Sequence, residues 1–180
     1  MSDPSVLAKA RDEASVVQIR TRFSDATFAC FPIEVGADLL LVLMLDDGFH
    51  MDGMRVMRPG DIAECICPHP HESFLEEVLR LRGEDEIELP ALSIESMAAL
   101  LETALVHLPL FTFHREEIER DKPIHGRVLE VDEEIVQLLE LDEDAMWAGE
   151  PTSLRLSDLT RVDLGGARLE AFYLVAGEPG

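Results

Sequence analysis

The sequence predicts a mainly β protein with flanking helices, made of two tandem copies of one small five-stranded β-barrel, each preceded by a helix. Three observations predict this fold class: an internal repeat with a period of about 96 residues, short segments in which apolar and polar residues alternate, and turn-forming residues between these segments. We expect the first copy to span residues 1–92 and the second copy residues 93–180. A chain of 180 residues is long enough for two such domains.

The repeat aligns residues of the same chemical type in the same order. The matched segments are Ile33-Glu34-Val35 with Leu129-Glu130-Val131, Leu45-Asp46 with Leu141-Asp142, Gly53 with Gly149, and Asp61-Ile62 with Asp158-Leu159. Only one inserted residue is needed, between the glycine and the last aspartate. Because turn positions and apolar positions agree together, the sequence favours two copies of one unit.

The first copy begins with a helix that we expect Asp3 to cap, with Pro4 in its first turn. The alternation of apolar and polar residues and the turn signals predict five strands, over residues 17–23, 28–35, 39–45, 49–57 and 61–67. The third of these is apolar at every position, which predicts cover on both faces. A helix is predicted over residues 72–82, followed by an acidic linker.

The second copy follows the same order. Ser93 is expected to cap a helix, with Met97, Leu100 and Leu101 among its inward residues. The five predicted strands cover residues 110–114, 126–131, 135–141, 152–156 and 158–162. The apolar segment 169–175 fits either a helix or a strand. A helix followed by five short strands with tight turns is similar to the Sm-like version of the SH3-type barrel.

A second resemblance is carried by the segment W-A-G-E-P-T-S-L-R-L-S-D-L-T-R-V-D-L-G-G, residues 147–166. It resembles the C-terminal signature of a family of uncharacterised bacterial proteins, which carry a tryptophan, a proline and a leucine before a D-I-T-R-V-D-F-G-G run. This chain has Leu159 and Leu164 where the family usually has Ile and Phe. The resemblance implies no activity, and likeness to the Sm fold does not by itself imply RNA binding.

The composition is strongly acidic, with 37 Asp and Glu against 15 Lys and Arg and a net charge of −22. Such a charge repels phosphates, so neither nucleic acid nor an anionic membrane is expected as a partner. It favours solubility, cations or a basic protein partner. The odd count of three cysteines and the lack of a basic or long apolar N-terminal segment predict a cytoplasmic protein with reduced thiols.

The clearest candidate for metal binding is the cluster Cys65, Cys67, His69 and His71. Two thiolates and two imidazoles suit tetrahedral zinc. The spacing is unfavourable, because alternate residues on a flat strand place their sulfur atoms about 6–7 Å apart. The alternative is two buried cysteines followed by exposed histidines. No cofactor is predicted other than a zinc ion at this cluster.

Other candidate residues have a binding interpretation and a structural one. Trp147, the only tryptophan, is a candidate partner-binding anchor or a packing residue. Asp61 and Asp158 are either ligand-facing acids or residues that bond backbone amides of the preceding turn. The acidic turns 46–47, 132–134 and 142–144 offer oxygen ligands for calcium, although none matches an EF-hand loop.

No catalytic motif is present, and no catalytic residues are predicted. The sequence lacks a nucleophile elbow, a P-loop, a dinucleotide-binding glycine motif and a His-Glu-x-x-His motif. His107, His114 and His125 lie near the start of the second copy without a partner at catalytic spacing. A triad of Ser157, His125 and an acid would have to assemble through the fold.

These observations favour a non-enzymatic protein-interaction module, such as an adaptor or immunity-like protein, with an acidic surface. An Sm-like RNA-binding protein is the first alternative, and it requires a basic patch formed by Arg20, Arg22, Arg55 and Arg58. A zinc-binding protein is the second. The apolar strands 39–45 and 135–141 predict a contact between the two copies, with homo-oligomerisation through the same surfaces as an alternative.

Overall fold

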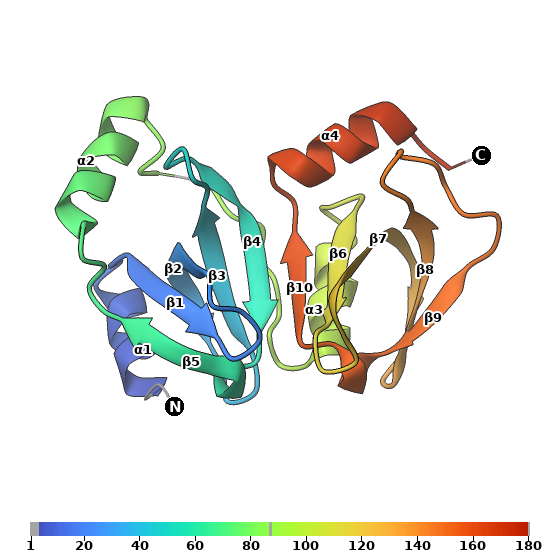
Figure 1. Cartoon of the computed structure of the whole chain (residues 1–180), viewed down its shortest axis with the longest axis horizontal. Coiled ribbons are helices and arrows are strands. Elements are labelled where there is room, and N and C mark those ends of the chain that lie inside the picture. Colours follow the sequence, from blue (N-terminus) through green and yellow to red (C-terminus); the bar gives the residue numbers. More distant parts are fainter. Residues whose placement is uncertain (1–3, 87, 180) are drawn as a thin grey trace. The chain divides into compact units, whose positions relative to one another are not determined.

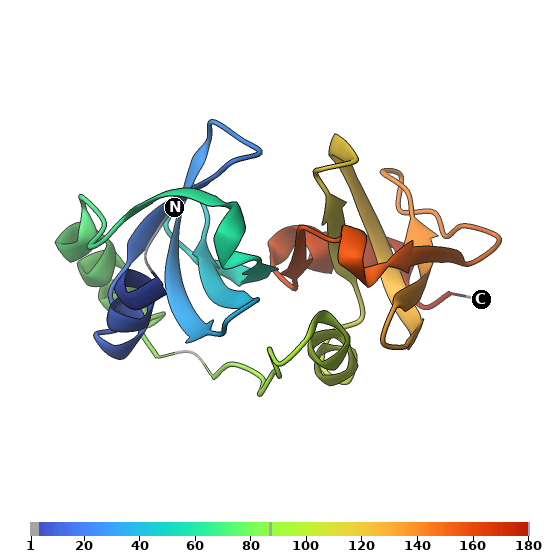
Figure 2. The same cartoon turned by 90° about the horizontal axis from the view of Figure 1, so that it is seen from below.

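The computed structural model describes residues 4–86 and 88–179. The chain divides into two compact units, Met1–Pro90 and Ala91–Gly180 (Figures 1 and 2). Among the described residues each unit contains five antiparallel strands and two α-helices. The predicted mainly β class with flanking helices is therefore confirmed. No helix in the described part of the chain is long and apolar enough to cross a bilayer.

In the first unit, helix α1 (Pro4–Asp12) precedes the strands and helix α2 (Glu72–Arg82) follows them. The strands are β1 (Val17–Thr21), β2 (Thr27–Val35), β3 (Leu40–Leu45), β4 (Met51–Met57) and β5 (Ile62–Ile66). Hydrogen bonds join them in the order β5-β1-β2-β3-β4. A single 3₁₀ turn, Pro59–Asp61, connects β4 to β5.

The core of the first unit lies on both faces of β3, as its apolar sequence predicts. Leu40 and Val42 pack in one cluster with Leu7 and Ala10 of α1. Leu45 packs in a second cluster with residues of α2. Burying a leucine side chain contributes about 1.5–3 kcal/mol, so α1 and α2 are held to the sheet mainly by these contacts.

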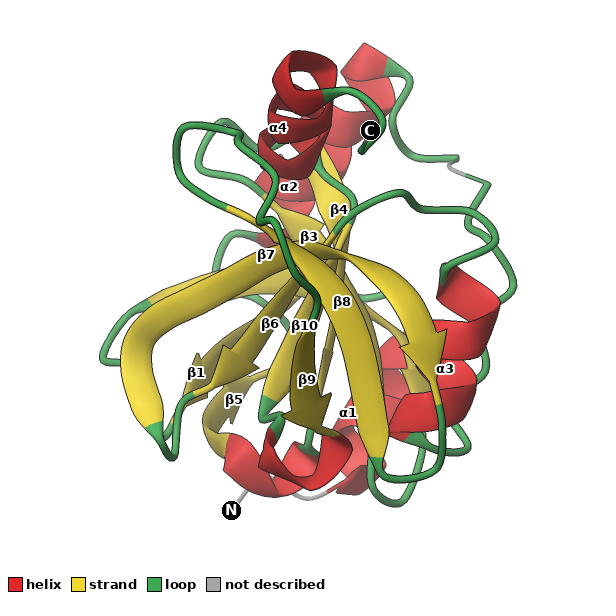
Figure 3. Cartoon of the chain, turned by 90° about the vertical axis from the view of Figure 1, so that its right-hand side faces the viewer, coloured by secondary structure: helices red, strands yellow, loops and turns green. Residues whose placement is uncertain are grey.

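In the second unit, helix α3 (Met97–Ala104) precedes the strands and helix α4 (Ala167–Ala176) follows them. The strands are β6 (Phe111–Arg115), β7 (Glu119–Val131), β8 (Ile135–Leu141), β9 (Thr152–Arg155) and β10 (Arg161–Leu164). Their order is β10-β6-β7-β8-β9, and each neighbouring pair is antiparallel. A 3₁₀ turn, Leu156–Asp158, precedes β10. Figure 3 shows the strong curvature of β7 and β8.

The two units share their strand order and their pairing register. In each unit the fifth strand pairs with the first, and the first to fourth strands pair in sequence. Cys30 pairs with Met44 in the first unit, and Gly126 pairs with Glu140 in the second, a shift of 96 residues on both strands. The register irregularity at Pro32/Glu34 recurs at Val128/Glu130 with the same shift.

The turn between the third and fourth strands is also repeated. The amide of Asp46 donates to the carbonyl of His50 at 2.9 Å, and the amide of Asp142 donates to the carbonyl of Met146 at 3.1 Å. The residue before each turn closes has a positive φ, 62° at Phe49 and 59° at Ala145. Such a φ is uncommon for residues other than glycine, so its recurrence marks a shared backbone conformation.

Several predicted boundaries are wrong. Helix α3 begins at Met97 and is capped by the Ser96 hydroxyl, not by Ser93. Strand β7 begins at Glu119, seven residues before the predicted start, and β10 begins at Arg161 because residues 156–158 form the 3₁₀ turn. Segment 169–175 lies in helix α4. The predicted cap Asp3 lies outside the described residues.

Candidate functional site

A groove in the first unit lies between the end of α1, strands β2 and β3, and helix α2. It encloses about 480 Å³. Its floor is apolar because Phe31 of β2 lies opposite Leu43 of β3, and Leu79 of α2 packs in the same cluster as Phe31. The floor residues are Phe31, Pro32, Ile33, Leu43, Met51 and Leu79. This surface is hereafter the first-unit groove.

Charged side chains form the rim of the first-unit groove. Arg11 pairs with its neighbour Asp12 at 2.7 Å, and Arg80 of α2 pairs with Glu77 at 2.7 Å. The hydrogen bond from Arg80 lowers the pKa of Glu77, so this carboxylate stays ionised beside the guanidinium. Both rim cations are thus matched by a carboxylate of the chain itself.

The last residue of α2 and the segment after it hold the carboxyl end of this helix against the sheet. The Arg82 guanidinium donates to the carbonyl of Gly48 at 2.8 Å. The Glu84 carboxylate accepts from the amide of Met51 at 3.0 Å and contacts Nδ1 of His50 at 2.7 Å. These two contacts lower the pKa of Glu84. Helix α2 is thereby tied to the β3–β4 turn, which positions its side chains over the groove floor.

The second unit has a smaller groove at the equivalent place, with a volume of about 340 Å³. Leu75 packs with Leu45, and Leu169 packs with the equivalent Leu141, so α2 and α4 cover their sheets in the same way. The lining residues include Leu108, Leu110, Leu169, Glu170 and Tyr173. Glu170 and Tyr173 therefore correspond to Glu76 and Leu79 of the first-unit groove.

The second groove lacks a floor of sheet residues. Arg127 lies where the first unit has Phe31, and its guanidinium pairs with the carboxylate of Glu178 near the end of the chain. The hydroxyl of Tyr173 donates to the same carboxylate. This charged contact occupies the position that the half-buried, apolar Phe31 holds in the first unit.

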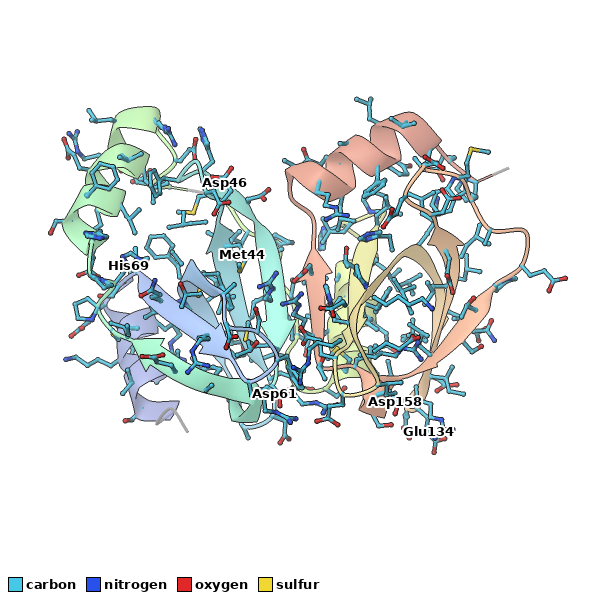
Figure 4. All side chains as sticks on the ribbon, in the orientation of Figure 1. Met44, Asp46, Asp61, His69, Glu134 and Asp158 are labelled. Atoms are coloured by element: carbon cyan, nitrogen blue, oxygen red, sulfur yellow. The ribbon has the colours of Figure 1, made fainter. Side chains whose placement is uncertain are left out.

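In the cluster of Cys65, Cys67, His69 and His71, Cys65 lies on β5 and the other three lie in the segment before α2. Figure 4 labels His69 there. Both thiols pack against the first core cluster, and burial raises the pKa of Cys65 to about 11. Nδ1 of His69 already accepts the amide of His71 at 3.0 Å. Among residues 4–86 and 88–179, no three His, Cys, Asp or Glu side chains lie close enough to hold a metal ion. Zinc binding stays a prediction.

Trp147 is half-buried and packs in the cluster formed by Leu110, Leu141 and Leu169. Its indole Nε1 donates to the carbonyl of Gly177 at 3.3 Å, just after the end of α4. These contacts give Trp147 a packing role under α4. None of these contacts tests whether Trp147 also anchors a partner, so that role stays a prediction.

Asp61 and Asp158 each end the 3₁₀ turn before the last strand of their unit (Figure 4). The side chain of Asp61 is buried and accepts from Nε of Arg22 at 2.8 Å. The expectation that Asp61 bonds a backbone amide of the preceding turn is therefore wrong. A neighbouring arginine supplies the partner, which sequence spacing alone did not indicate.

The acidic turns use their carboxylates to bond backbone amides. Oδ1 of Asp46 accepts from the amide of His50 at 2.8 Å, and Oδ1 of Asp132 accepts from the amide of Ile135 at 2.8 Å. Oδ1 of Asp142 accepts from the amide of Met146 at 2.8 Å. Each of these aspartates closes a hairpin turn, which is a common role for the residue type.

A buried polar cluster in the second unit was not foreseen from the sequence. His114 of β6 contacts Asp163 of β10 through Nε2 at 3.0 Å, and Arg161 donates to the His114 ring at 3.1 Å. Glu116 lies 3.5 Å from Arg161, and the Thr160 hydroxyl lies 2.9 Å from the same carboxylate. The cluster forms because Arg161 pairs in register with His114 across the antiparallel strands.

His125 lies on β7 beside this polar cluster. Its Nδ1 lies 2.9 Å from the hydroxyl of Thr112, and its ring is 5.0 Å from the ring of Phe172 in α4. Burial, with the nearby Arg168 and His114, lowers the pKa of His125 and favours the neutral ring. The triad considered from the sequence, with Ser157, His125 and an acid, stays a prediction, since these contacts of His125 are with Thr112 and Phe172.

The C-terminal signature segment contributes mainly to these packing and polar contacts. Trp147 packs under α4, and Thr160, Arg161 and Asp163 belong to the polar cluster. Gly165 and Gly166 have positive φ values of 66° and 90°, which allow the chain to turn from β10 into α4. Residues of this segment therefore join the last strand to α4 and hold both in place.

Comparisons with known proteins add no relative. No protein-family model, no curated protein and no solved structure matches the chain.

Proposed function

We propose that the chain is a non-catalytic protein-binding module of the adaptor or immunity type, whose acidic surface receives a basic protein. The observation that carries the proposal is the charge and its even distribution. Residues 1–92 contain 18 acidic and 8 basic side chains, giving −10, and residues 93–180 contain 19 and 7, giving −12. A field of one sign over both halves attracts partners of the opposite sign and speeds their encounter.

The state of the arginines supports a protein partner over RNA. Arg20 pairs with Glu64 at 3.2 Å, and Arg22 pairs with Asp61 at 2.8 Å. The guanidinium of Arg55 stacks on the ring of Phe28 at 4.9 Å. Because phosphate binding depends on cations with uncompensated charge, arginines that face carboxylates offer RNA little affinity.

We further propose that the two units are copies of one Sm-like, SH3-type unit that arose by duplication. The shared strand order, the constant shift of 96 residues in β2–β3 and β7–β8, and the repeated positive φ at Phe49 and Ala145 support this. We propose as well that the chain is a member of the family of uncharacterised bacterial proteins that residues 147–166 resemble.

Capture of a partner at two salt concentrations tests the protein-binding function. The immobilised full chain is incubated with bacterial lysate at 50 mM salt and washed at 50 or 500 mM salt. We expect a basic protein to be retained at 50 mM and released at 500 mM salt, because screening shortens the range of the field to a few Å. Treatment with nuclease is the control that removes RNA-bridged proteins. The proposal would be contradicted if retention depended on RNA, or if no basic protein were retained.

A further inference from the structure

We propose that the first-unit groove is the docking site for an extended segment of the basic partner, which inserts one large apolar side chain between flanking lysine or arginine residues. This inference rests on the proposed protein-binding function and names the surface and the chemistry of the segment. The groove belongs entirely to the first unit, since its lining residues fall between Arg11 and Leu89.

The apolar floor of the groove sets the central residue of the segment. A volume of about 480 Å³ falls in the range of pockets that hold small ligands and single large side chains. The half-buried Phe31, Ile33 and Met51 offer hydrocarbon surface without a hydrogen-bonding group. A leucine, methionine or phenylalanine side chain is complementary to this floor, whereas a polar side chain would lose its hydration there.

The charges on the rim set the flanking residues of the segment. Arg11 and Arg80 already have carboxylate partners within the chain. Within residues 4–86 and 88–179, neither Glu76 nor Asp85 has an ion-pair partner, and both side chains are exposed on the rim. The rim therefore presents the carboxylate of Glu76, which has no ion-pair partner, and that of Asp85, which interacts electrostatically with the nearby Arg80, beside an apolar floor. Lysine or arginine residues on both sides of the inserted side chain match this arrangement.

The second unit provides a comparison within the same molecule. Glu170 of α4 occupies the position of Glu76, but Arg127 and its partner Glu178 lie where the first unit has the half-buried ring of Phe31. A segment that needs both the acid and the apolar floor is expected to bind the first-unit groove alone. Reversing the charge at Glu76 in one variant and at Glu170 in another changes the net charge equally. A difference in peptide affinity between the two variants then shows binding at the first-unit groove and not a general attraction to an acidic protein.

The test uses the full chain and a synthetic probe. The probe is a fluorescent nine-residue peptide with a central leucine and two arginine or lysine residues on each side. A second peptide has serine in place of the leucine, and binding is followed by fluorescence anisotropy at 150 mM salt. We expect the leucine peptide to bind about tenfold more tightly than the serine peptide, since only the leucine buries apolar surface.

Two variants locate the binding. Glu76→Lys is expected to weaken binding of the leucine peptide about tenfold. Glu170→Lys makes the same change in net charge and is expected to weaken this binding less than about twofold. Both glutamates are exposed on the surface of their helices. Thermal unfolding of each variant checks that the fold is unchanged. Equal loss in both variants, or equal affinity for the serine peptide, would overturn the groove assignment.

The outcomes separate this inference from the proposed function. If a basic protein is captured in a salt-dependent way, but neither peptide distinguishes Glu76→Lys from the native chain, the function stands and the groove assignment is wrong. If the leucine peptide binds the groove as expected but no basic protein is captured, the groove assignment stands and the proposed partner class is wrong.

Discussion

Replacing Gly126 by alanine is expected to destabilise the second unit by about 3 kcal/mol and to lower its Tm by about 15 °C. Gly126 is buried on β7, and a Cβ there would lie 2.7 Å from the carbonyl oxygen of Leu139 and 2.5 Å from Cδ1 of Leu138. The carbonyl belongs to the neighbouring strand, so relief requires a backbone shift. Thermal unfolding followed by circular dichroism measures the effect.

The matched control for this substitution is Gly149→Ala in the same unit. A Cβ at Gly149 meets no atom within 4 Å, and its φ is not positive, so alanine is expected to change the Tm by less than about 2 °C. A Gly126→Ala variant as stable as Gly149→Ala would show that β7 and β8 are not as close as described. In the first unit, Cys30 replaces this glycine and lies opposite Val17, whereas Gly126 lies opposite the larger Phe111.

Replacing Thr160 by valine is expected to cost about 2–3 kcal/mol of unfolding free energy. Thr160 is 1% exposed, and its hydroxyl oxygen accepts from the amide of Glu116 at 3.1 Å and lies 2.9 Å from the Glu116 carboxylate. Valine has nearly the same shape but cannot form either bond, so a buried amide and a buried carboxylate lose a partner. Urea unfolding at neutral pH gives the free energy.

Thr160→Ser distinguishes the hydroxyl from the methyl group. Serine keeps the hydroxyl bonds and loses one buried methyl, so we expect a cost of about 1 kcal/mol or less. If the serine variant is less stable than the valine variant, packing of the methyl group and not the polar cluster holds Glu116 in place.

The sequence predicted the local elements well where a periodic pattern decides the structure. The strand 135–141 and the helix 72–82 have the predicted bounds, because β8 is a continuous apolar-rich run between turns and α2 is strongly amphipathic. The two-faced burial of β3 also followed from its composition. The turn aspartates Asp46 and Asp142 were recognised as turn residues, and their carboxylates bond the turn amides.

The features that depend on pairing between distant segments were not predicted. The polar cluster joins His114 to Arg161 and Asp163, which are 47 and 49 residues away, through the β6–β10 register. The first half of β7 is charged and contains a proline, so composition gave no reason to extend the strand to Glu119. The first-unit groove arises where α1, β2, β3 and α2 pack together, and the sequence does not specify this packing.

Hydrogen–deuterium exchange of the full chain, alone and in complex with the captured basic protein, tests the central claim most directly. We expect the partner to slow exchange in β2, around residues 31–33, and in α2, around residues 76–80, since these segments form the first-unit groove. The equivalent segments of α4 and β7 are expected to exchange at unchanged rates. Protection confined to the second unit, or no protection in β2 and α2, would contradict binding of a basic protein through this groove.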